Sequence, residues 1–349
     1  MVFPGKTGHF SVARVRDAWY VAARSAELGP APIARTILDT PLVLFRDAAG
    51  APSALLDRCA HRNVPLSQGW CSAGHLVCAY HGWEYQGDGA VIRVPALSGD
   101  QSGKARRAPC FPVREQQGLI WVWLSPDTAP SAEPYQLPHL GEAGYDHIHY
   151  EADMQASLHA SLENILDVPH TAFLHRGLFR GGKQTKITAS VRRSADRAEA
   201  EYVGEPRPEG WIGRLLAPGG GTVEHFDRFL LPSIAQVEYR LGPDNHVVVT
   251  SLLTPIQDFL TRMYSTASFR LRFPHFLVGI GLRPLAKKVI AQDVVMLKAQ
   301  TEAVQRFGGE QYVSTDVDLL GPHILRLLRQ AERGEHASAP FEEQVELLA

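Results

Sequence analysis

The chain has 349 residues, of which 45% are hydrophobic and 21% are charged, and its formal net charge at pH 7 is −2. This length suits two domains, and the composition is ordinary for a globular protein. The small net charge argues against nucleic acid or an anionic membrane as partner, and no apolar run suits a signal peptide or a membrane span, so we expect a cytoplasmic protein.

Residues 1–150 are predicted to form a β-rich domain. After an opening segment, short apolar runs alternate with turns from Ile33 to Leu124, and Gln86–Gly89 is one such turn. The run GLIWVWLSP reads as a buried strand that ends at Pro126. The stretch 127–135, rich in Pro, Ala and Ser, is typical of a linker.

Residues 151–349 are predicted to form a second domain of mixed structure. Apolar residues recur at helical spacing near residues 156–166, and a strand-rich region follows from Thr185 to Phe273. A long helix is expected after Pro274, with a stop signal at Gly308-Gly309, and a last helix over Pro322–Arg333 precedes an acidic tail. The pattern indicates an α+β protein in which a sheet is flanked by helices.

Two short pairs of metal-ligand residues interrupt the β-rich domain. Cys59-Ala60-His61 and Cys78-Ala79-Tyr80-His81 each supply one thiolate and one imidazole, with sixteen residues between the pairs. A zinc finger usually keeps its cysteines in one pair and its histidines in the other. Mixed pairs suit a [2Fe–2S] cluster in which the cysteines bind one iron and the histidines the other, the Rieske arrangement. A structural zinc site and four unrelated core residues are the less favoured alternatives.

A second candidate site begins in the first predicted helix. Asn164, Asp167 and His170 are three residues apart, so they fall near one face of a helix, and a kink at Pro169 would turn His170 and His175 toward one point. Two such histidines need a carboxylate to complete the 2-His-1-carboxylate triad of mononuclear iron(II) oxygenases.

The pattern Cys-x-His-x16-Cys-x2-His, with HRNVPLS after the first pair and YHGW around the last ligand, resembles the Rieske non-haem iron oxygenases. It is similar to the oxygenase (alpha) subunit of the monooxygenase and demethylase branch. The resemblance implies an all-β Rieske domain, with the cluster on Cys59, His61, Cys78 and His81, before a helix-grip catalytic domain with an antiparallel sheet. It also implies mononuclear iron(II) on His170 and His175.

The resemblance points to Asp293 as the third iron ligand, because the family's carboxylate lies on its late helix in a similar context; Glu302 is the fallback. It assigns Asp167 a bridging role, between His170 of its own chain and the cluster histidine, His81, of a neighbouring subunit. Asn164 would support the iron ligands. Electrons would then cross a subunit interface, which implies a head-to-tail homotrimer.

The predicted activity is that of a terminal oxygenase component, with O2 as co-substrate. We expect it to hydroxylate or oxidatively demethylate a small aromatic or alicyclic molecule. The chain carries no flavin or nicotinamide fingerprint, so NAD(P)H would act only through a separate reductase or ferredoxin. A ring-hydroxylating dioxygenase that forms a cis-diol would use the same iron ligands and remains an alternative. A Rieske electron carrier without oxygenase activity would have no use for the second domain.

The sequence names neither the substrate nor its pocket, which we expect in the sheet and in Trp211–Phe229. The remaining cysteines, Cys71 and Cys110, are interpreted as lone thiols. Four further histidines are interpreted as structural or surface residues, and one apolar helical stripe as core. These are His139, His147, His149 and His159, and Val289, Val294, Met296 and Leu297.

Overall fold

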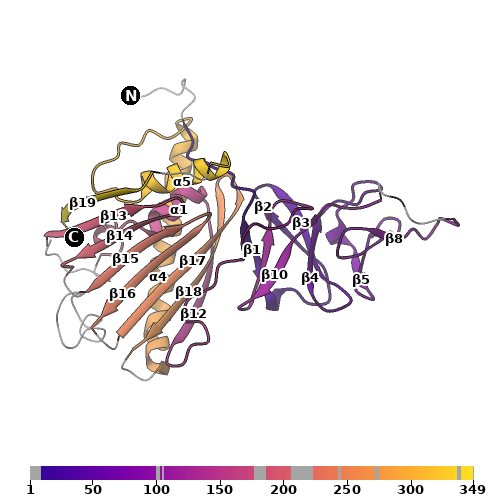
Figure 1. Ribbon diagram of the computed structural model, residues 1–349, viewed down its shortest axis with the longest axis horizontal. Coiled ribbons are helices and arrows are strands. Elements are labelled where there is room, and N and C mark those ends of the chain that lie inside the picture. The colour runs from indigo at the N-terminus through magenta and orange to yellow at the C-terminus, as the bar shows by residue number, and fades with distance from the viewer. Residues whose placement is uncertain are drawn as a thin grey trace. The chain divides into compact units, whose positions relative to one another are not determined.

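The computed structural model describes residues 9–99, 103, 106–176, 186–205, 223–242, 245–271, 275–335 and 339–348, and the side chains of residues 275–282 are not described. The chain divides into two compact units, Arg16–Gln136 and Leu137–Ala349, and residues 1–15 belong with the second (Figure 1). The sequence placed this division between residues 150 and 151. The structure differs because β12 (Asp146–Met154) is an edge strand of the second unit's sheet.

The opening segment joins the second unit through polar contacts. The backbone N–H of Ser11 donates to the Glu310 carboxylate at 2.8 Å, and the Arg14 guanidinium pairs with Asp258 at 2.7 Å. Because these partners lie far along the chain, no local pattern could predict where residues 9–15 belong.

The first unit contains small antiparallel sheets of three, four and four strands. The three-stranded sheet has the order β1 (Trp19–Arg24), β11 (Leu119–Trp123), β10 (Val113–Gln116). One four-stranded sheet has the order β2 (Ile33–Ile37), β3 (Thr40–Arg46), β4 (Pro52–Leu56), β9 (Cys110–Phe111). The other has the order β5 (Trp70–Ser72), β6 (His75–Val77), β7 (Glu84–Tyr85), β8 (Val91–Arg93). Two short 3-10 helices, η1 (Ser25–Glu27) and η2 (Leu66–Gln68), complete it. The predicted all-β domain is confirmed, and the run GLIWVWLSP forms β11, of which Ile120–Trp123 is buried.

The second unit is built on one antiparallel sheet of eight strands. Its order is β12, β18 (Leu260–Arg270), β17 (Asn245–Gln257), β16 (Ile234–Leu241), β15 (Glu224–Leu230), β14 (Arg197–Val203), β13 (Lys186–Arg193), β19 (Phe341–Leu348). The residues expected as an acidic tail form β19, which pairs with β13 over its whole length. Among its described residues, the helices are α1 (Leu158–Ile165), α2 (Thr171–Leu174), α4 (His275–Arg306) and α5 (Gly321–Glu332). The predicted α+β fold, an antiparallel sheet flanked by helices, is confirmed.

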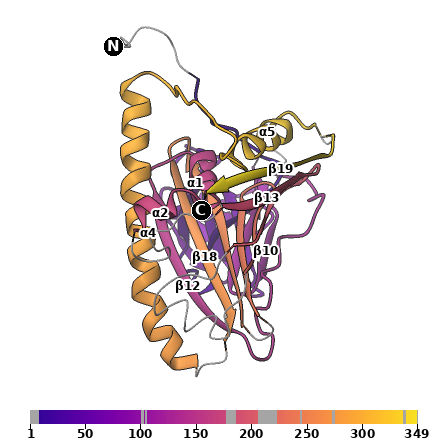
Figure 2. The same ribbon diagram turned by 90° about the vertical axis from the view of Figure 1, so that its left-hand side faces the viewer.

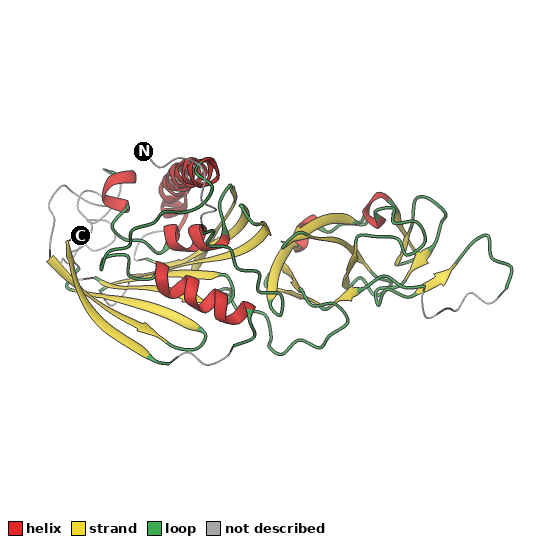
Figure 3. Cartoon of the chain, turned by 90° about the horizontal axis from the view of Figure 1, so that it is seen from above, coloured by secondary structure: helices red, strands yellow, loops and turns green. Residues whose placement is uncertain are grey.

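One face of this sheet carries the helices, and α4 runs along it (Figures 2 and 3). Met154 of β12 and Met263 of β18 contact Ala160 of α1 and Leu297 of α4 in one buried apolar cluster. Burial of such side chains contributes roughly 1.5–3 kcal/mol each, so this cluster fixes α1 and α4 against the same strands.

Capping residues define the helix ends. The Ser157 side chain accepts a hydrogen bond from the Ala160 N–H at 3.1 Å and starts α1. The predicted stop of α4 is confirmed, because the helix ends at Arg306 and Gly308 follows with φ of 74°. In the described part of the chain, no helix is both long and apolar enough to cross a bilayer.

Replacing Gly89 with Ala should destabilise the first unit more than the same change at Gly118. Both glycines have positive φ, 86° and 77°, so both variants carry the left-handed penalty of about 1–2 kcal/mol. A Cβ at residue 89 would also lie 2.0 Å from the Ala108 carbonyl oxygen, whereas residue 118 has open space. Thermal unfolding of the two purified variants checks this, and equal loss of stability would contradict it.

Candidate metal centres

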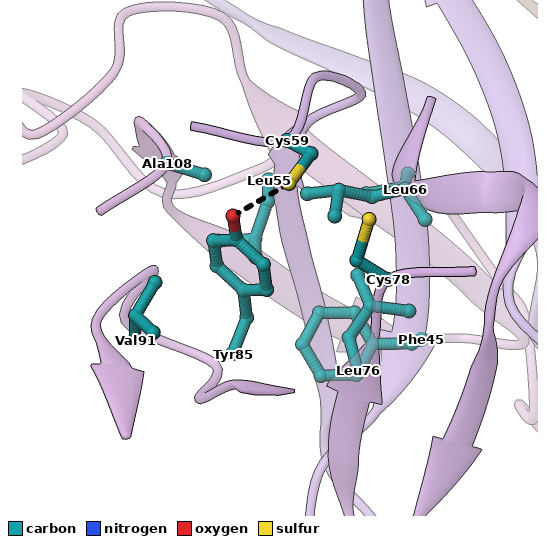
Figure 4. Packing of buried hydrophobic residues seen from close by; sticks show 10 residues of the cluster. Phe45, Leu55, Cys59, Leu66, Leu76, Cys78, Tyr85, Val91 and Ala108 are labelled. Carbon is teal, nitrogen blue, oxygen red and sulfur yellow. Dashed lines mark hydrogen bonds between the residues drawn. The ribbon is translucent and has the colours of Figure 1, made fainter. Parts of the chain in front are cut away.

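The two cysteine-histidine loops of the first unit share one backbone design. In each loop, the backbone N–H of the cysteine donates a hydrogen bond to the carbonyl of the residue five positions later. The carbonyl of the cysteine accepts a hydrogen bond from the N–H of the residue four positions later. These bonds are 2.9–3.0 Å long. The residues at the fourth position, Asn63 and Gly82, have φ of 63° and 67°, a conformation that Asn and Gly tolerate best. Both loops therefore turn tightly around their cysteine, and Cys59 and Cys78 lie in one buried cluster (Figure 4).

The two histidines of these loops lie side by side. The ring centroids of His61 and His81 are 4.5 Å apart, and His61 stacks on Trp83 with ring planes 2° apart. Nδ1 of His61 is buried and has no hydrogen-bond partner, which is costly unless another group takes its lone pair. Loss of hydration lowers the pKa of His61, and the charges of His81 and Arg62 lower it further by smaller amounts. The lowered pKa favours the neutral imidazole, which is the form that binds metal.

A tyrosine completes the surroundings of the first cysteine. The Tyr85 hydroxyl lies 3.1 Å from Sγ of Cys59 and accepts a hydrogen bond from the Ala60 N–H at 3.0 Å (Figure 4). Burial raises the pKa of Tyr85, and its hydrogen bond with Cys59 raises this pKa further. Two buried sulfurs and two neighbouring imidazoles, of which His81 is exposed, fit the donor set of a [2Fe–2S] cluster with mixed ligands.

The second candidate centre begins where α1 ends. A kinked helix was expected through Pro169, but α1 stops at Ile165 and a separate short helix, α2, starts at Thr171. Pro169 lacks an N–H and cannot continue α1. The two histidines therefore flank α2, at its N-cap and its C-cap, and both reach one point.

Three ligand atoms converge at that point. Nε2 of His170 and Nε2 of His175 are 3.2 Å apart, and Oδ1 of Asp293 lies 3.7 Å from the first and 3.2 Å from the second. Asp293 comes from α4, so the centre joins two distant segments. Among the described residues, this is the one group of at least three His, Cys, Asp or Glu side chains with metal-binding geometry.

The far side of each imidazole faces an acceptor. Nδ1 of His175 lies 3.0 Å from Oε1 of Gln292, and Nδ1 of His170 lies 3.4 Å from Oδ2 of Asp167. Gln292 is the hydrogen-bond acceptor for Nδ1 of His175, which leaves a lone pair on Nε2 of that ring, whereas Nδ1 of His170 makes no hydrogen bond. Oδ1 of Asp293 is buried and also has no hydrogen-bond partner. Two imidazole nitrogens and one carboxylate oxygen form the donor set of a facial triad, and the set fits iron(II).

The electrostatics of the site follow from its burial. Desolvation raises the pKa of Asp293, although the two histidines and a hydrogen bond from Asn164 oppose this. Burial lowers the pKa of His170, but its proximity to Asp167, together with the charge of Asp293, outweighs this effect, so the net shift is upward. The acidic residues thus make a strongly cation-attracting site.

Other predicted residues lie outside this centre. Glu302, the fallback ligand, is exposed on α4 and lies 3.8 Å from Lys298. The stripe interpreted as core is only partly buried, because Leu297 is buried but Met296 is 51% exposed. His159 is buried, with Nε2 2.9 Å from the Gly321 carbonyl oxygen. Residues 211–222 of the expected pocket segment lie outside the described residues.

Three residues around the centres were not predicted: Gln292, Trp83 and Tyr85. Each is next to, or within four residues of, a predicted ligand, and this proximity was the only signal in the sequence. Cys71 and Cys110 are free thiols, as expected.

Both halves of the chain match known families. A profile described as Rieske [2Fe-2S] domain matches residues 18–112, and one described as Vanillate O-demethylase oxygenase C-terminal domain matches residues 154–334. The chain is 39% identical, over 293 residues, to the oxygenase component of dicamba O-demethylase from Stenotrophomonas maltophilia. That match covers 83% of this chain and 75% of that protein.

Solved structures agree with the sequence matches. Dicamba monooxygenase bound to 3,6-dichlorosalicylic acid superimposes with a TM-score of 0.78 and 26% identity, covering 94% of this chain and 100% of that chain. Dicamba monooxygenase with non-haem iron and dicamba gives a TM-score of 0.70 and 25% identity, over 92% and 98% of the two chains.

Replacing Gln292 with Leu should weaken iron binding roughly 10- to 100-fold, the usual effect of removing a partner that orients a metal-binding histidine. The His175 ring would lose the acceptor that holds its proton on Nδ1. Gln305→Leu, at an exposed position of the same helix, serves as control. Iron titration of the metal-free protein measures the affinity, and an unchanged value in the Gln292 variant would contradict this role.

Proposed function

Because this chain belongs to the Rieske non-haem iron oxygenases, we propose that it is a terminal oxygenase that hydroxylates or demethylates a small aromatic or alicyclic molecule. The family uses a Rieske [2Fe–2S] cluster, mononuclear iron and O2, and the chain carries a donor set for each metal centre. By analogy with dicamba O-demethylase, an O-methyl group is the favoured target.

The observation that carries the proposal is the convergence of three ligand atoms, from His170, His175 and Asp293. A Rieske electron carrier needs no second metal centre. We therefore assign the second unit as the catalytic domain and the first as the electron-donating domain, with Cys59, His61, Cys78 and His81 as cluster ligands.

Residues of this chain position the proposed iron ligands. When bound, iron(II) supplies open coordination positions for O2, and the cluster supplies electrons one at a time. His170, His175 and Asp293 would hold the iron on one side. Gln292 and Asp167 orient the two imidazoles, and Asn164 orients Asp293. These contacts fix the ligands before iron binds, so that little reorganisation is needed.

Asp167 is the proposed entry point for electrons. Its carboxylate faces Nδ1 of His170 yet is 33% exposed, so a second partner can approach it. His81 is exposed at the tip of the first unit. We propose that Asp167 bridges His170 to His81 of a neighbouring subunit in a homotrimer, and that a reductase or ferredoxin supplies the electrons. A cytoplasmic location stays a prediction.

Both centres can be tested by EPR on anaerobically reduced protein, with an iron count. A Rieske signal, and a high-spin iron–nitrosyl signal after addition of nitric oxide, is the expected result. A Rieske signal alone in iron-replete protein would overturn the second site. Product analysis then tests the reaction: one oxygen atom incorporated, or formaldehyde released, supports the proposal, whereas a cis-diol would show a dioxygenase.

Asp167→Asn should leave both metals bound but slow electron transfer roughly 10- to 100-fold, because the amide cannot carry the carboxylate's charge. Asp316→Asn, at an exposed position of the same unit, serves as control. Single-turnover oxidation of the reduced cluster measures the rate. A wild-type rate in the Asp167 variant, with iron content intact, would disprove the bridge.

A further inference from the structure

We propose that the substrate of this protein is a small aromatic molecule with a protonated amino group, which is recognised by a buried acidic triad in the second unit. The acidic triad consists of Glu205, His225 and Asp227, none of which is a proposed iron ligand. The inference rests on the proposed oxygenase function and names the class of substrate that this function would serve.

His225 is bonded to a carboxylate through each of its ring nitrogens. Nδ1 lies 2.7 Å from Oε2 of Glu205, and Nε2 lies 3.0 Å from Oδ1 of Asp227. A neutral imidazole has one N–H, so a ring between two carboxylates carries protons on both nitrogens. Burial lowers the pKa of His225, but the charges and hydrogen bonds of Asp227 and Glu205 outweigh it and raise the pKa to about 9. Two negative charges therefore face one positive charge, and one negative charge is left over.

Two tyrosines enclose the imidazolium ring. The ring centroid of His225 lies 4.5 Å from that of Tyr202 and 4.2 Å from that of Tyr239, with ring planes 20° and 21° apart. The faces of aromatic rings attract cations. Tyr202 also shares a hydrogen bond with Asp227. Tyr202 and His225 are buried, whereas Tyr239 is half-buried, so a second cation can approach the acidic triad from the Tyr239 side.

The acidic triad lies on the sheet face that carries the iron site. Met263 of β18 contacts α1 and α4 on this face, and Phe269, six positions later, points to the same side. Paired residues of neighbouring strands share a face. Phe269 pairs with Val247, Val247 with Tyr239, and Tyr239 with His225. The helix that supplies the proposed carboxylate ligand of the iron and the acidic triad therefore lie on one side of the sheet.

The middle of this face leaves room for a small molecule. Val237 of β16, Val247 and Val249 of β17, and Ala267 of β18 all point to the helix side, yet each is only half-buried. Side chains in the middle of a sheet become fully buried where a helix packs directly on them. Their partial exposure marks an aliphatic surface beside Tyr239, which suits the ring of an aromatic substrate.

The surplus charge of the acidic triad selects the polar end of that substrate. A buried carboxylate without a compensating cation is unfavourable, and a protonated amine compensates it, whereas a carboxylate on the substrate would be repelled. The amino group would then face Tyr239 and the acidic triad, and the ring would lie on the valines. This preference is opposite to that expected for an acid, such as the 3,6-dichlorosalicylic acid bound by dicamba monooxygenase.

Matched probes that differ only in charge test the proposal. The ortho, meta and para isomers of methoxybenzylamine carry an amine, and the methoxybenzoates carry a carboxylate at the same position. We expect the iron-loaded protein to bind at least one amine about tenfold or more tightly than its matched benzoate, the usual scale of a hydrogen bond to a charged group. Titration calorimetry without O2 measures this binding ratio without turnover.

Glu205→Gln removes the surplus charge and keeps the shape of the side chain, so the binding ratio should fall roughly tenfold. Asp227→Asn should act in the same direction and decides the question if the first variant does not fold. Glu201→Gln is the matched control, because Glu201 directly precedes Tyr202 in β14 and therefore points to the opposite face of the sheet. Its binding ratio should equal that of the wild-type protein.

Three results would overturn the inference: benzoates that bind as tightly as the amines, a wild-type protein that binds none of the amines, or a ratio that stays unchanged in the folded Glu205 and Asp227 variants. An equal fall of the ratio in Glu201→Gln would do the same. Formaldehyde release is followed in parallel. Amines that bind as expected but release no formaldehyde would support the charge preference and count against the proposed O-demethylation instead.

Discussion

The constraint on which the second unit depends is the convergence of two imidazole nitrogens and one carboxylate oxygen at one point. These atoms lie 3.2–3.7 Å apart, and Oδ1 of Asp293 is buried without a hydrogen-bond partner. A buried carboxylate oxygen in this state is unfavourable unless a cation compensates it. The break between α1 and α2, the position of α4 on the sheet and the apolar contacts beneath them all serve to hold these atoms together.

A sequence reveals features set by the spacing of nearby residues more readily than features set by contacts between distant segments. The cluster ligands could be proposed from the sequence because each pair lies within one tight loop, where the residue types and their spacing indicate the chemistry. Asp293 could be proposed only by resemblance, since nothing in its own helix distinguishes it from Glu302 nine residues later. The edge strand β19 and the contacts of residues 9–15 also escaped prediction, because each depends on partners far along the chain. Pro169 was expected to kink a helix, and the structure shows that the helix stops before it, since a proline can do either.

Gln292 and Tyr85 show a further limit. Both lie in segments whose importance was predicted, yet the sequence does not say which way a side chain points. Gln292 matters because its oxygen faces His175, and Tyr85 because its hydroxyl faces Cys59. In both cases, a neutral side chain contacts a proposed metal ligand. These contacts are found only when distances are known.

The iron site also has a mechanical consequence. It joins the segment after α1 to α4, whose contacting residues His175 and Gln292 are 117 positions apart. An ion that binds the folded chain and leaves the unfolded one stabilises the fold by binding linkage, by about 2.7 kcal/mol when free iron is at 100 times its dissociation constant. Iron starvation would then reduce the amount of this protein in a cell, as well as its activity, because the metal-free chain opens more often to proteases.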